Sequence, residues 1–450
     1  MNNLSDVLPG KVSREPEDLR CYGFDASGLE APPGAVVWAD DERDVVKVMQ
    51  YADANNVPVI PRGAGTGMTG GSIPAEGAIV LSTERMNRIL EIDKENLTVL
   101  VEPGVINGRL QRELERHRLF YPPDPSSLNF CTIGGNVAEN AGGARAIKYG
   151  VTRDYVMGLE AVLSDGRVIT TGVKTAKGVV GYDLTRLLVG SEGTLAVITK
   201  IRLKVLPLPE DVITLLALFR ELEPSGEAVK GIIAEGILPR TLEFLDAETI
   251  RAVENYKTIG LPRETEAMLL IELDGAPSVI MRDAGRISDI CKKLKGEIIM
   301  AENELARMKL WEARRAISPA LFHISPTKIN EDIVVPRSRL SEMLTRLRML
   351  SLNTGIRIVN FGHAGDGNIH VNLMVDRANS EEYEKAQKLV EEIFRATLEM
   401  GGTISGEHGI GLTKQNYISM EIHPAELELM KKIKQAFDPK NLLNPGKIFP

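Results

Sequence analysis

The sequence predicts a mixed α+β protein with more than one domain, and three observations support this. The chain has 450 residues, which exceeds the size that one hydrophobic core usually supports. Short apolar runs alternate with helical patterns up to Pro207 and Pro209, and beyond these prolines the spacing of strands and helices changes. We therefore predict three segments, residues 1–207, 208–402 and 403–450, the last of which returns to the first.

Composition narrows the function classes. A hydrophobic content of 43% and a charged content of 26% are typical of a soluble globular protein, and the net charge of −8 argues against nucleic acid as a partner. Cys21, Cys131 and Cys291 are far apart and odd in number, which argues against a disulfide framework and suits a reducing compartment. No secretory signal and no bilayer-spanning apolar run is visible. We predict a cytoplasmic protein that contacts the inner face of a membrane only through a partner.

The first segment alternates strands and helices. Asp40 is predicted to cap a helix in which Val45, Val48, Met49 and Ala52 share one face. Further strands are predicted at 35–39, 57–60, 78–82 and 97–102, and a further helix at 105–116. This order is that of an α/β unit with short strands.

A glycine-rich stretch, Pro61–Gly71, follows the second of these strands. Its five glycines free the backbone to adopt positive φ and to present a row of N–H groups, which suits an anion such as a diphosphate. Residues Gly65–Gly70 match G-x-G-x-x-G, but Ser72-Ile73-Pro74 replace the helix that the dinucleotide fingerprint requires. The alternative is a plain surface loop, and the stretch favours the phosphate cradle.

A second glycine-rich stretch, Thr132–Gly143, follows a rigid proline turn at 121–127. Its small residues would let a flat ring lie against the backbone or would let a helix pack tightly, and the stretch alone does not decide between the two. Residues 157–164 and 167–171 are predicted to form a hairpin around Asp165-Gly166, a favoured turn pair. A third glycine-containing stretch, 189–195, precedes a long strand that ends at Val205.

In order, the segments Pro61–Gly71, Pro122–Gly143 and Gly190–Ile198 resemble the FAD-binding domain of the vanillyl-alcohol oxidase/p-cresol methylhydroxylase superfamily. The resemblance implies a two-part FAD-binding domain in which the first loop holds the FAD diphosphate and the second region flanks the isoalloxazine. Because no histidine lies between Met1 and Arg116, we expect non-covalent FAD, and Cys131 is more simply a packed thiol. The implied cofactor-binding residues are Pro61, Arg62, Gly63, Gly65, Thr66, Gly67, Thr69, Gly70, Pro123, Asp124, Thr132, Gly134, Gly135, Asn136, Gly142, Gly143, Glu192, Gly193, Ile198 and Asn444.

The segment from Asp211 to Ala301 predicts a ferredoxin-like cap domain, with helices on one face of an antiparallel sheet. Predicted strands cover 212–219, 241–245, 268–273 and 297–301, and predicted helices cover 225–235, 247–256 and 278–295. After a last helix at 425–437, Asp438–Lys447 resembles the closing motif of the same superfamily, which packs beside the FAD; Asn444 and Lys447 are candidate contacts there.

Three of the six histidines fall in two short glycine-containing stretches late in the chain. Two predicted strands flank a Gly/Asp/Asn turn, so His363 and His370 can converge, and Asn372 faces the same side as His370. Glu407 and His408 lie together in the second stretch. Two imidazoles and a carboxylate suit Zn, Mn or Fe. The alternative is a set of satisfied core histidines, and their clustering favours a site.

Residues 362–372 and 405–409 resemble the FAD-linked oxidase C-terminal domain, which marks the branch of D-lactate, glycolate and D-2-hydroxyglutarate dehydrogenases; the similarity covers nearly the whole chain. The resemblance implies the metal ligands His363, His370 and Glu407, the catalytic base His408 and the substrate contact Asn372. Oxidation of a 2-hydroxy acid needs such groups because the hydroxyl proton must leave together with a hydride from the same carbon.

The substrate carboxylate also needs a cation. Trp311-Glu312-Ala313-Arg314 resembles the Trp-x-x-Arg of this branch, whose arginine clamps the carboxylate, whereas Arg315 is predicted to be a helix-surface charge. Lys328 is a second candidate. The lysine of the hydroxyglutarate enzymes falls at Asn330, which favours a smaller acid.

We predict an FAD- and metal-dependent dehydrogenase of a D-2-hydroxy acid, D-lactate or glycolate. The alternatives are a D-2-hydroxyglutarate dehydrogenase, an oxidase that uses oxygen directly, or a non-catalytic FAD subunit that relays electrons. Because no CxxC motif is present, no iron–sulfur centre is built in. The expected partners are therefore a small substrate and an electron acceptor: an iron–sulfur subunit, electron-transferring flavoprotein or a quinone.

Overall fold

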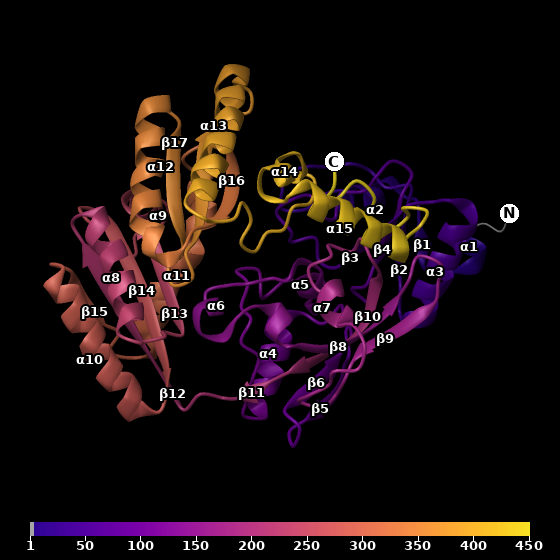
Figure 1. The fold of residues 1–450 in the computed structure, drawn as a ribbon, viewed down its shortest axis with the longest axis horizontal. Helices are drawn as coiled ribbons and strands as arrows, with labels where there is room; N and C mark the ends of the chain where they lie inside the picture. Colours follow the sequence, from indigo (N-terminus) through magenta and orange to yellow (C-terminus); the bar gives the residue numbers. More distant parts are fainter. Residues whose placement is uncertain (1–3) are drawn as a thin grey trace. The chain divides into compact units, whose positions relative to one another are not determined.

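The computed structural model describes residues 4–450, which form two compact units. The first unit contains the chain up to Gly142, residues 150–208 and residues 407–450, and the second contains residues 143–149 and 209–406. Figure 1 labels the helices and strands of both units. The chain thus leaves the first unit twice, once for a segment of seven residues and once for most of its middle.

The first unit is built on two sheets. One has the order β1 (Val12–Ser13), β2 (Ala35–Trp38), β4 (Ile79–Ser82), β3 (Val59–Arg62), with β2, β4 and β3 parallel. The other is antiparallel, in the order β5 (Ile89–Asp93), β6 (Thr98–Val101), β10 (Val197–Lys204), β8 (Val156–Val162), β9 (Val168–Gly172). A short ribbon joins β11 (Leu206–Pro207) to β7 (Leu119–Phe120). The predicted hairpin at 157–171 is confirmed as β8–β9.

The helices of the first unit are short except for three. They are α1 (Leu4–Val7), α2 (Pro16–Cys21), α3 (Glu42–Asn55), α4 (Asn107–Arg116), α5 (Ile133–Glu139), α7 (Leu184–Leu188), α14 (Ile418–Glu421), α15 (Pro424–Phe437) and the 3-10 turns η1 (Thr152–Asp154) and η3 (Gln415–Tyr417). Helix α3 is capped by Asp41, whose carboxylate accepts from Arg43 N and Asp44 N, so the predicted cap at Asp40 is wrong by one residue. Asp40 instead pairs with Lys11.

The second unit is built on one antiparallel sheet of seven strands, which confirms the predicted antiparallel cap. Their order is β15 (Glu297–Met300), β12 (Asp211–Phe219), β14 (Ala267–Gly275), β13 (Thr241–Asp246), β17 (Arg357–His363), β18 (Asn368–Val375), β16 (Thr327–Val334). Strand β16 at the edge was not predicted from the sequence.

Helices cover both faces of this sheet, so the expectation of helices on one face is wrong. They are α6 (Ala146–Tyr149), α8 (Leu222–Ala234), α9 (Ala247–Tyr256), α10 (Pro277–Lys293), α11 (Glu304–Leu321), α12 (Leu340–Thr354), α13 (Ser380–Glu399) and the turn η2 (Arg337–Arg339). Leu216 and Leu218 of β12 join the core under α9 and α11, whereas the next residue, Phe219, meets Gly296 after α10. Two covered faces explain why β12 and β14 are nearly continuous apolar runs.

Among residues 4–450, no helix combines the length and the apolar character that a membrane span requires.

Candidate active site

The glycine-rich loop after β3 uses its carbonyls, but not its N–H groups, in hydrogen bonds to the described protein. Gly65 and Gly70 adopt φ of +65° and +81°, which glycine accepts at no steric cost. The loop carbonyls are occupied: Gly67 O accepts from Ala26 N, and Thr69 O accepts from Leu412 N. In the described chain, by contrast, the backbone N–H groups of residues 63–71 donate to no protein acceptor. A row of unused N–H groups fits an anion such as the FAD diphosphate.

Arg62 adds a positive charge under this loop. The residue is 5% exposed, and its Nη1 has no hydrogen-bond partner among the described residues. Burial lowers the pKa of the Arg62 guanidinium, which nevertheless stays protonated at neutral pH. A Cβ at Gly65 would collide with this guanidinium, so the loop can lie over it only with glycine there. The charges of Asp25 and Glu84 act on this guanidinium, but its buried Nη1 donates to none of the described residues, which fits an anionic ligand.

The second glycine-rich stretch forms helix α5, and its residues serve packing. Thr132 caps the helix by accepting from Gly135 N, and a Cβ at Gly134 would lie 2.5 Å from Pro103. Asn136 Oδ1 accepts from Asn107 Nδ2 at 2.9 Å. Cys131 is buried, and burial raises the pKa of its thiol, so it is a packed thiol. The structure thus supports the helix-packing alternative for these positions.

The other predicted cofactor residues of the first unit are spread around the loop. Gly193 packs against Pro61, and Ile198 lies in β10. Asn444 Nδ2 donates to Gly71 O and Glu192 O, and Lys447 Nζ donates to Ile73 O. Pro123 offers its carbonyl to Asn107 and Gln111, and Gly142 lies against Glu407. Gly143 belongs to the second unit.

The turn that carries Glu407 and His408 is anchored on the glycine-rich loop of the same unit. Thr69 Oγ1 donates to His408 O at 2.9 Å. Beyond His408, Ile410 N and Gly411 N donate to the two carboxylate oxygens of Glu192, each at 2.8 Å. The predicted base is therefore held by the loop that carries the N–H row.

Gly409 in this turn is crowded by two acids. It adopts a φ of +80°, and a Cβ there would lie 2.6 Å from Glu139 Oε2 and 2.9 Å from Glu192 Oε1. Gly409→Ala should cost more than the ~1–2 kcal/mol of a left-handed L-residue, because the added methyl must also displace a buried carboxyl group. Gly77→Ala is the matched control, since Gly77 has a φ of +69° and open space around its Cβ position. Equal losses of unfolding free energy in denaturant titrations would refute the crowding.

One face of the seven-stranded sheet carries a strip of buried polar side chains. The register pairs Glu243 of β13 with His363 of β17, which places these two side chains on one face. Strand β18 continues the strip, because its His370 and Asn372 stand opposite Asp332 and Asn330 of β16. The ring centroids of His363 and His370 are 5.2 Å apart. The structure thus brings together both histidines and the amide that the sequence predicted.

His363 is oriented by a buried acid. Its Nδ1 lies 2.5 Å from Glu243 Oε1, and Arg314 Nε donates to Glu243 Oε2 at 2.6 Å. Burial alone would raise the pKa of Glu243, but His363 and Arg314 outweigh it, so this pKa lies below its usual value. An ionised Glu243 accepts a hydrogen bond from Nδ1–H of His363. In the neutral imidazole, the lone pair is then on Nε2. Arg314, predicted to bind a carboxylate, thus already holds one through its Nε.

Glu243→Ala should destabilise the second unit by roughly 3–5 kcal/mol, because it leaves the buried Arg314 without its carboxylate. Glu243→Gln keeps the shape of the side chain and should lose less unfolding free energy. The control is Glu312→Ala, which removes only the exposed ion pair with Lys257 and should leave stability unchanged. Denaturant-induced unfolding measures all three, and an unaffected Glu243→Ala would show that the pair contributes no net stability.

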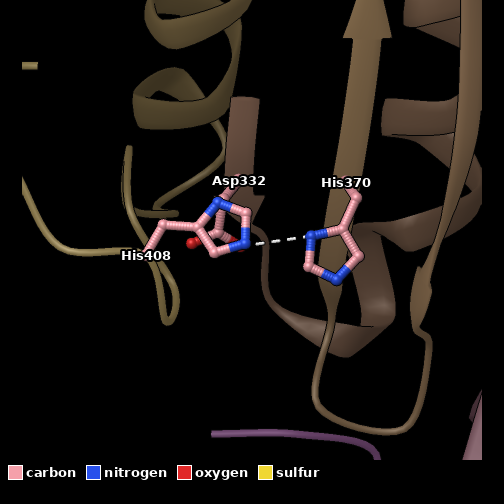
Figure 2. Close-up of side chains that lie close together, drawn as sticks. All are labelled: Asp332, His370 and His408. Atoms are coloured by element: carbon pink, nitrogen blue, oxygen red, sulfur yellow. Dashed lines mark ion pairs between the residues drawn. The ribbon is translucent and has the colours of Figure 1, made fainter. Parts of the chain in front are cut away.

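His370 faces a second acid. Its Nδ1 lies 3.7 Å from Asp332 Oδ1, and Figure 2 shows this pair. Asp332 also accepts from Asn368 Nδ2 at 2.5 Å and from Gly406 N at 2.9 Å. The third side chain in Figure 2, His408, follows Gly406 by two residues. Asp332 therefore holds the segment from which the Glu407–His408 turn continues, and its carboxylate faces His370.

The amide pair and a lysine extend the strip toward α11. Asn330 Nδ2 donates to Asn372 Oδ1 at 2.7 Å, and Asn372 Nδ2 donates to Val359 O and His370 O. The buried Oδ1 of Asn330 has no protein partner among residues 4–450. Lys328 Nζ donates to Ser318 Oγ at 3.1 Å, and burial lowers its pKa to about 8.

Comparison with known proteins matches both units to families. The family described as FAD linked oxidases, C-terminal domain, matches residues 208–448, and an FAD binding domain matches residues 33–172. The chain belongs to the FAD-linked oxidase family.

Relatives of this FAD-linked oxidase span almost its full length. It is 46% identical to the glycolate oxidase subunit GlcD of Bacillus subtilis (strain 168), over 95% of this chain and 92% of that protein. It is 36% identical to a D-lactate dehydrogenase of Anaerostipes hadrus, over 100% and 96%. p-Cresol methylhydroxylase with substrate bound has a similar fold, with a TM-score of 0.79 at 18% identity over 99% and 95% of the two chains. The predicted FAD-linked oxidase family, fold class and FAD dependence are confirmed.

Three acids of this flavoprotein were not predicted in their observed roles. Glu243 and Asp332 were not singled out, and Glu192 was predicted to contact FAD, whereas both its oxygens accept from backbone N–H groups. The available signal for Glu243 was an acid between two apolar residues in the interior of the strand Thr241–Asp246. Its partner His363 lies 120 residues away, so the sequence gave no local indication of the pair.

Proposed function

We propose that this protein oxidises a small 2-hydroxy acid, D-lactate or glycolate, to the 2-oxo acid. The carrying observation is the buried His363–His370 pair, each histidine facing its own acid, in a family member whose other unit presents an anion cradle. The names of the relatives, a glycolate oxidase subunit and a D-lactate dehydrogenase, support the same substrate class.

We further propose that the first unit holds FAD non-covalently and that His363, His370 and Glu407 hold a divalent metal, Zn, Mn or Fe. When bound, FAD supplies a hydride acceptor, and the metal supplies a Lewis acid for the substrate hydroxyl. The donor set fits, because Glu243 orients the His363 imidazole, Asp332 faces His370, and Glu407 continues from Gly406, which Asp332 holds. No histidine precedes His117, which pairs with Glu113, and Cys131 is packed, which supports non-covalent FAD.

His408 is proposed to take the hydroxyl proton. An aliphatic hydroxyl is too weak an acid to ionise at neutral pH, so a positioned imidazole is needed as the hydride leaves the same carbon. Asn372 has both amide donors engaged, so it acts through Asn330, whose buried Oδ1 is the atom that the pair offers to substrate.

Arg314 and Lys328 are proposed to bind the substrate carboxylate. Because the pKa of Lys328 is lowered to about 8, its ammonium is present below that pH and is lost above it. The KM for the acid should therefore rise with pH above about 8, approaching tenfold per unit. Lys328→Met should have a high KM that no longer rises there, and Arg315→Met, on the exposed face of α11, should behave like the wild type. A wild-type KM that stays constant to pH 10 would exclude Lys328 from this role.

The test of the function is anaerobic bleaching of the purified yellow protein. D-Lactate or glycolate should reduce the flavin, and L-lactate should not. Reduction by D-2-hydroxyglutarate alone would favour the larger substrate. No reduction by D-lactate, glycolate or D-2-hydroxyglutarate, with FAD and metal bound, would favour a non-catalytic relay subunit. The proposed electron acceptor is an iron–sulfur subunit, electron-transferring flavoprotein or a quinone. A protein that co-purifies with this chain would favour one of the first two over a quinone.

A further inference from the structure

Glu192 is held in an unusual backbone conformation. Its φ is +50°, which costs a non-glycine residue free energy and is kept only where the surroundings enforce it. Glu192 N donates to Ala138 O at 2.8 Å, and its carbonyl accepts from Asn444 Nδ2 at 2.7 Å. Hydrogen bonds at both its N–H and its carbonyl thus fix the backbone of Glu192, and with it the direction of the side chain.

The buried carboxylate of Glu192 accepts hydrogen bonds from the backbone of one turn. Oε1 accepts from Ile410 N and Oε2 from Gly411 N, each at 2.8 Å, so both oxygens are used. These donors come two and three residues after His408, whose carbonyl accepts from Thr69 Oγ1. The turn is therefore fixed before and after Gly409, and its direction depends on the carboxylate.

This arrangement costs free energy of folding, because a second acid, Glu139, lies beside Glu192. Glu139 is buried next to Glu192, and burial together with the charge of Glu192 raises the pKa of Glu139 well above its usual value. Glu139 therefore carries the proton of the pair. Burial raises the pKa of Glu192 as well, but the two N–H groups and the charges of the buried Lys447 and Lys414 oppose that rise. A fold that only needed to fill this space would do so with apolar side chains.

We propose that Glu192 is a positioning residue, which fixes the His408–Gly411 turn and thereby the direction of the His408 imidazole. This inference rests on the proposed role of His408 as base. This role is separate from the predicted FAD contact of Glu192, because both of its carboxylate oxygens accept from the backbone of the turn.

The test compares Glu192→Gln with Glu102→Gln. In Glu192→Gln, one N–H of the turn must face the amide NH2, so the turn shifts while the volume is kept. Glu102 is the matched control: it is buried in the same unit and accepts from a backbone N–H, that of Arg88 at 2.8 Å. Stopped-flow flavin reduction by D-lactate should slow about 100-fold in Glu192→Gln, as for a misplacement of about 1 Å. The FAD content and the KM should stay unchanged, and Glu102→Gln should reduce at the wild-type rate.

The decisive measurement repeats Glu192→Gln in a His408→Ala background. If Glu192 acts only through His408, the second change should add less than a twofold loss. A full additional 100-fold loss, or release of FAD by Glu192→Gln alone, would overturn the inference. Should Glu192→Gln fail to fold, Glu192→Asp, which keeps the charge but shortens its reach, takes its place in the same cycle. If His408→Ala itself reduced flavin at the wild-type rate, the proposed function would fail instead, which the same data distinguish.

Discussion

Replacement of His408 by alanine is expected to slow flavin reduction by about 10²–10⁴-fold, the range that a positioned general base contributes. FAD should remain bound, because the loop N–H groups and Arg62 do not involve the imidazole. The His408 side chain contributes to none of these three hydrogen bonds that hold its turn: Thr69 donates to the His408 carbonyl, and Glu192 accepts from Ile410 N and Gly411 N. The variant should therefore fold and bind cofactor like the wild type.

The measurement is anaerobic stopped-flow reduction at saturating D-lactate, with FAD content from the absorbance spectrum. Added imidazole should restore part of the rate, because a free base can enter the space that the side chain vacates. His423→Ala is the matched control, since His423 only caps α15 at the surface of the same unit. A His408→Ala protein that reduced at the wild-type rate would assign the proton to another group.

The predictions from the sequence succeeded where local chemistry determines structure. Helix α9 has the predicted bounds of 247–256 because Asp246 caps it by accepting from Thr249 N. The β8–β9 hairpin follows from Asp165-Gly166, with Gly166 at a φ of +85°. The absence of a helix after Gly71 also holds, since residues 72–78 form turns.

Prediction failed where a strand turns its polar side toward the site. Strand β16 was missed because one of its faces carries Lys328, Asn330 and Asp332. In the sequence, these polar residues make the segment resemble a loop. Their burial comes from β18, and no local pattern encodes that pairing. The same holds for the acids behind the histidines, whose role appears only when distant strands meet.

The candidate site contains two groups of residues, and only one of them could be recognised from the sequence. The residues predicted to bind metal were recognisable as types, histidine and glutamate in glycine turns. The residues that orient them, Glu243 and Asp332, lie inside regular strands. Orientation by such acids fixes which nitrogen of an imidazole is available, so the unpredicted residues decide whether the predicted ones can act as ligands.

His363→Ala should abolish stoichiometric metal binding and reduce turnover by about 10³-fold or more, because the substrate hydroxyl loses its Lewis acid. The protein should still fold, since Glu243 keeps its ion pair with Arg314 at 2.6 Å and is not left as an isolated buried charge. FAD should stay bound, because all of its predicted contacts except Gly143 belong to the other unit. Elemental analysis and D-lactate turnover measure both effects. Prolonged dialysis of the wild type against a chelator should give the same inactive yellow protein.

The control for metal loss is His323→Ala. His323 is exposed and stacks on Tyr256, away from the polar strip, so its removal should change neither metal content nor rate. Returning Zn, Mn or Fe singly to the chelated wild type should restore turnover with one of them, and none should restore His363→Ala. A chelated protein that keeps full activity would separate the two halves of the proposal: the hydroxy-acid chemistry would stand, and the His363–His370 pair would be a structural feature of the sheet.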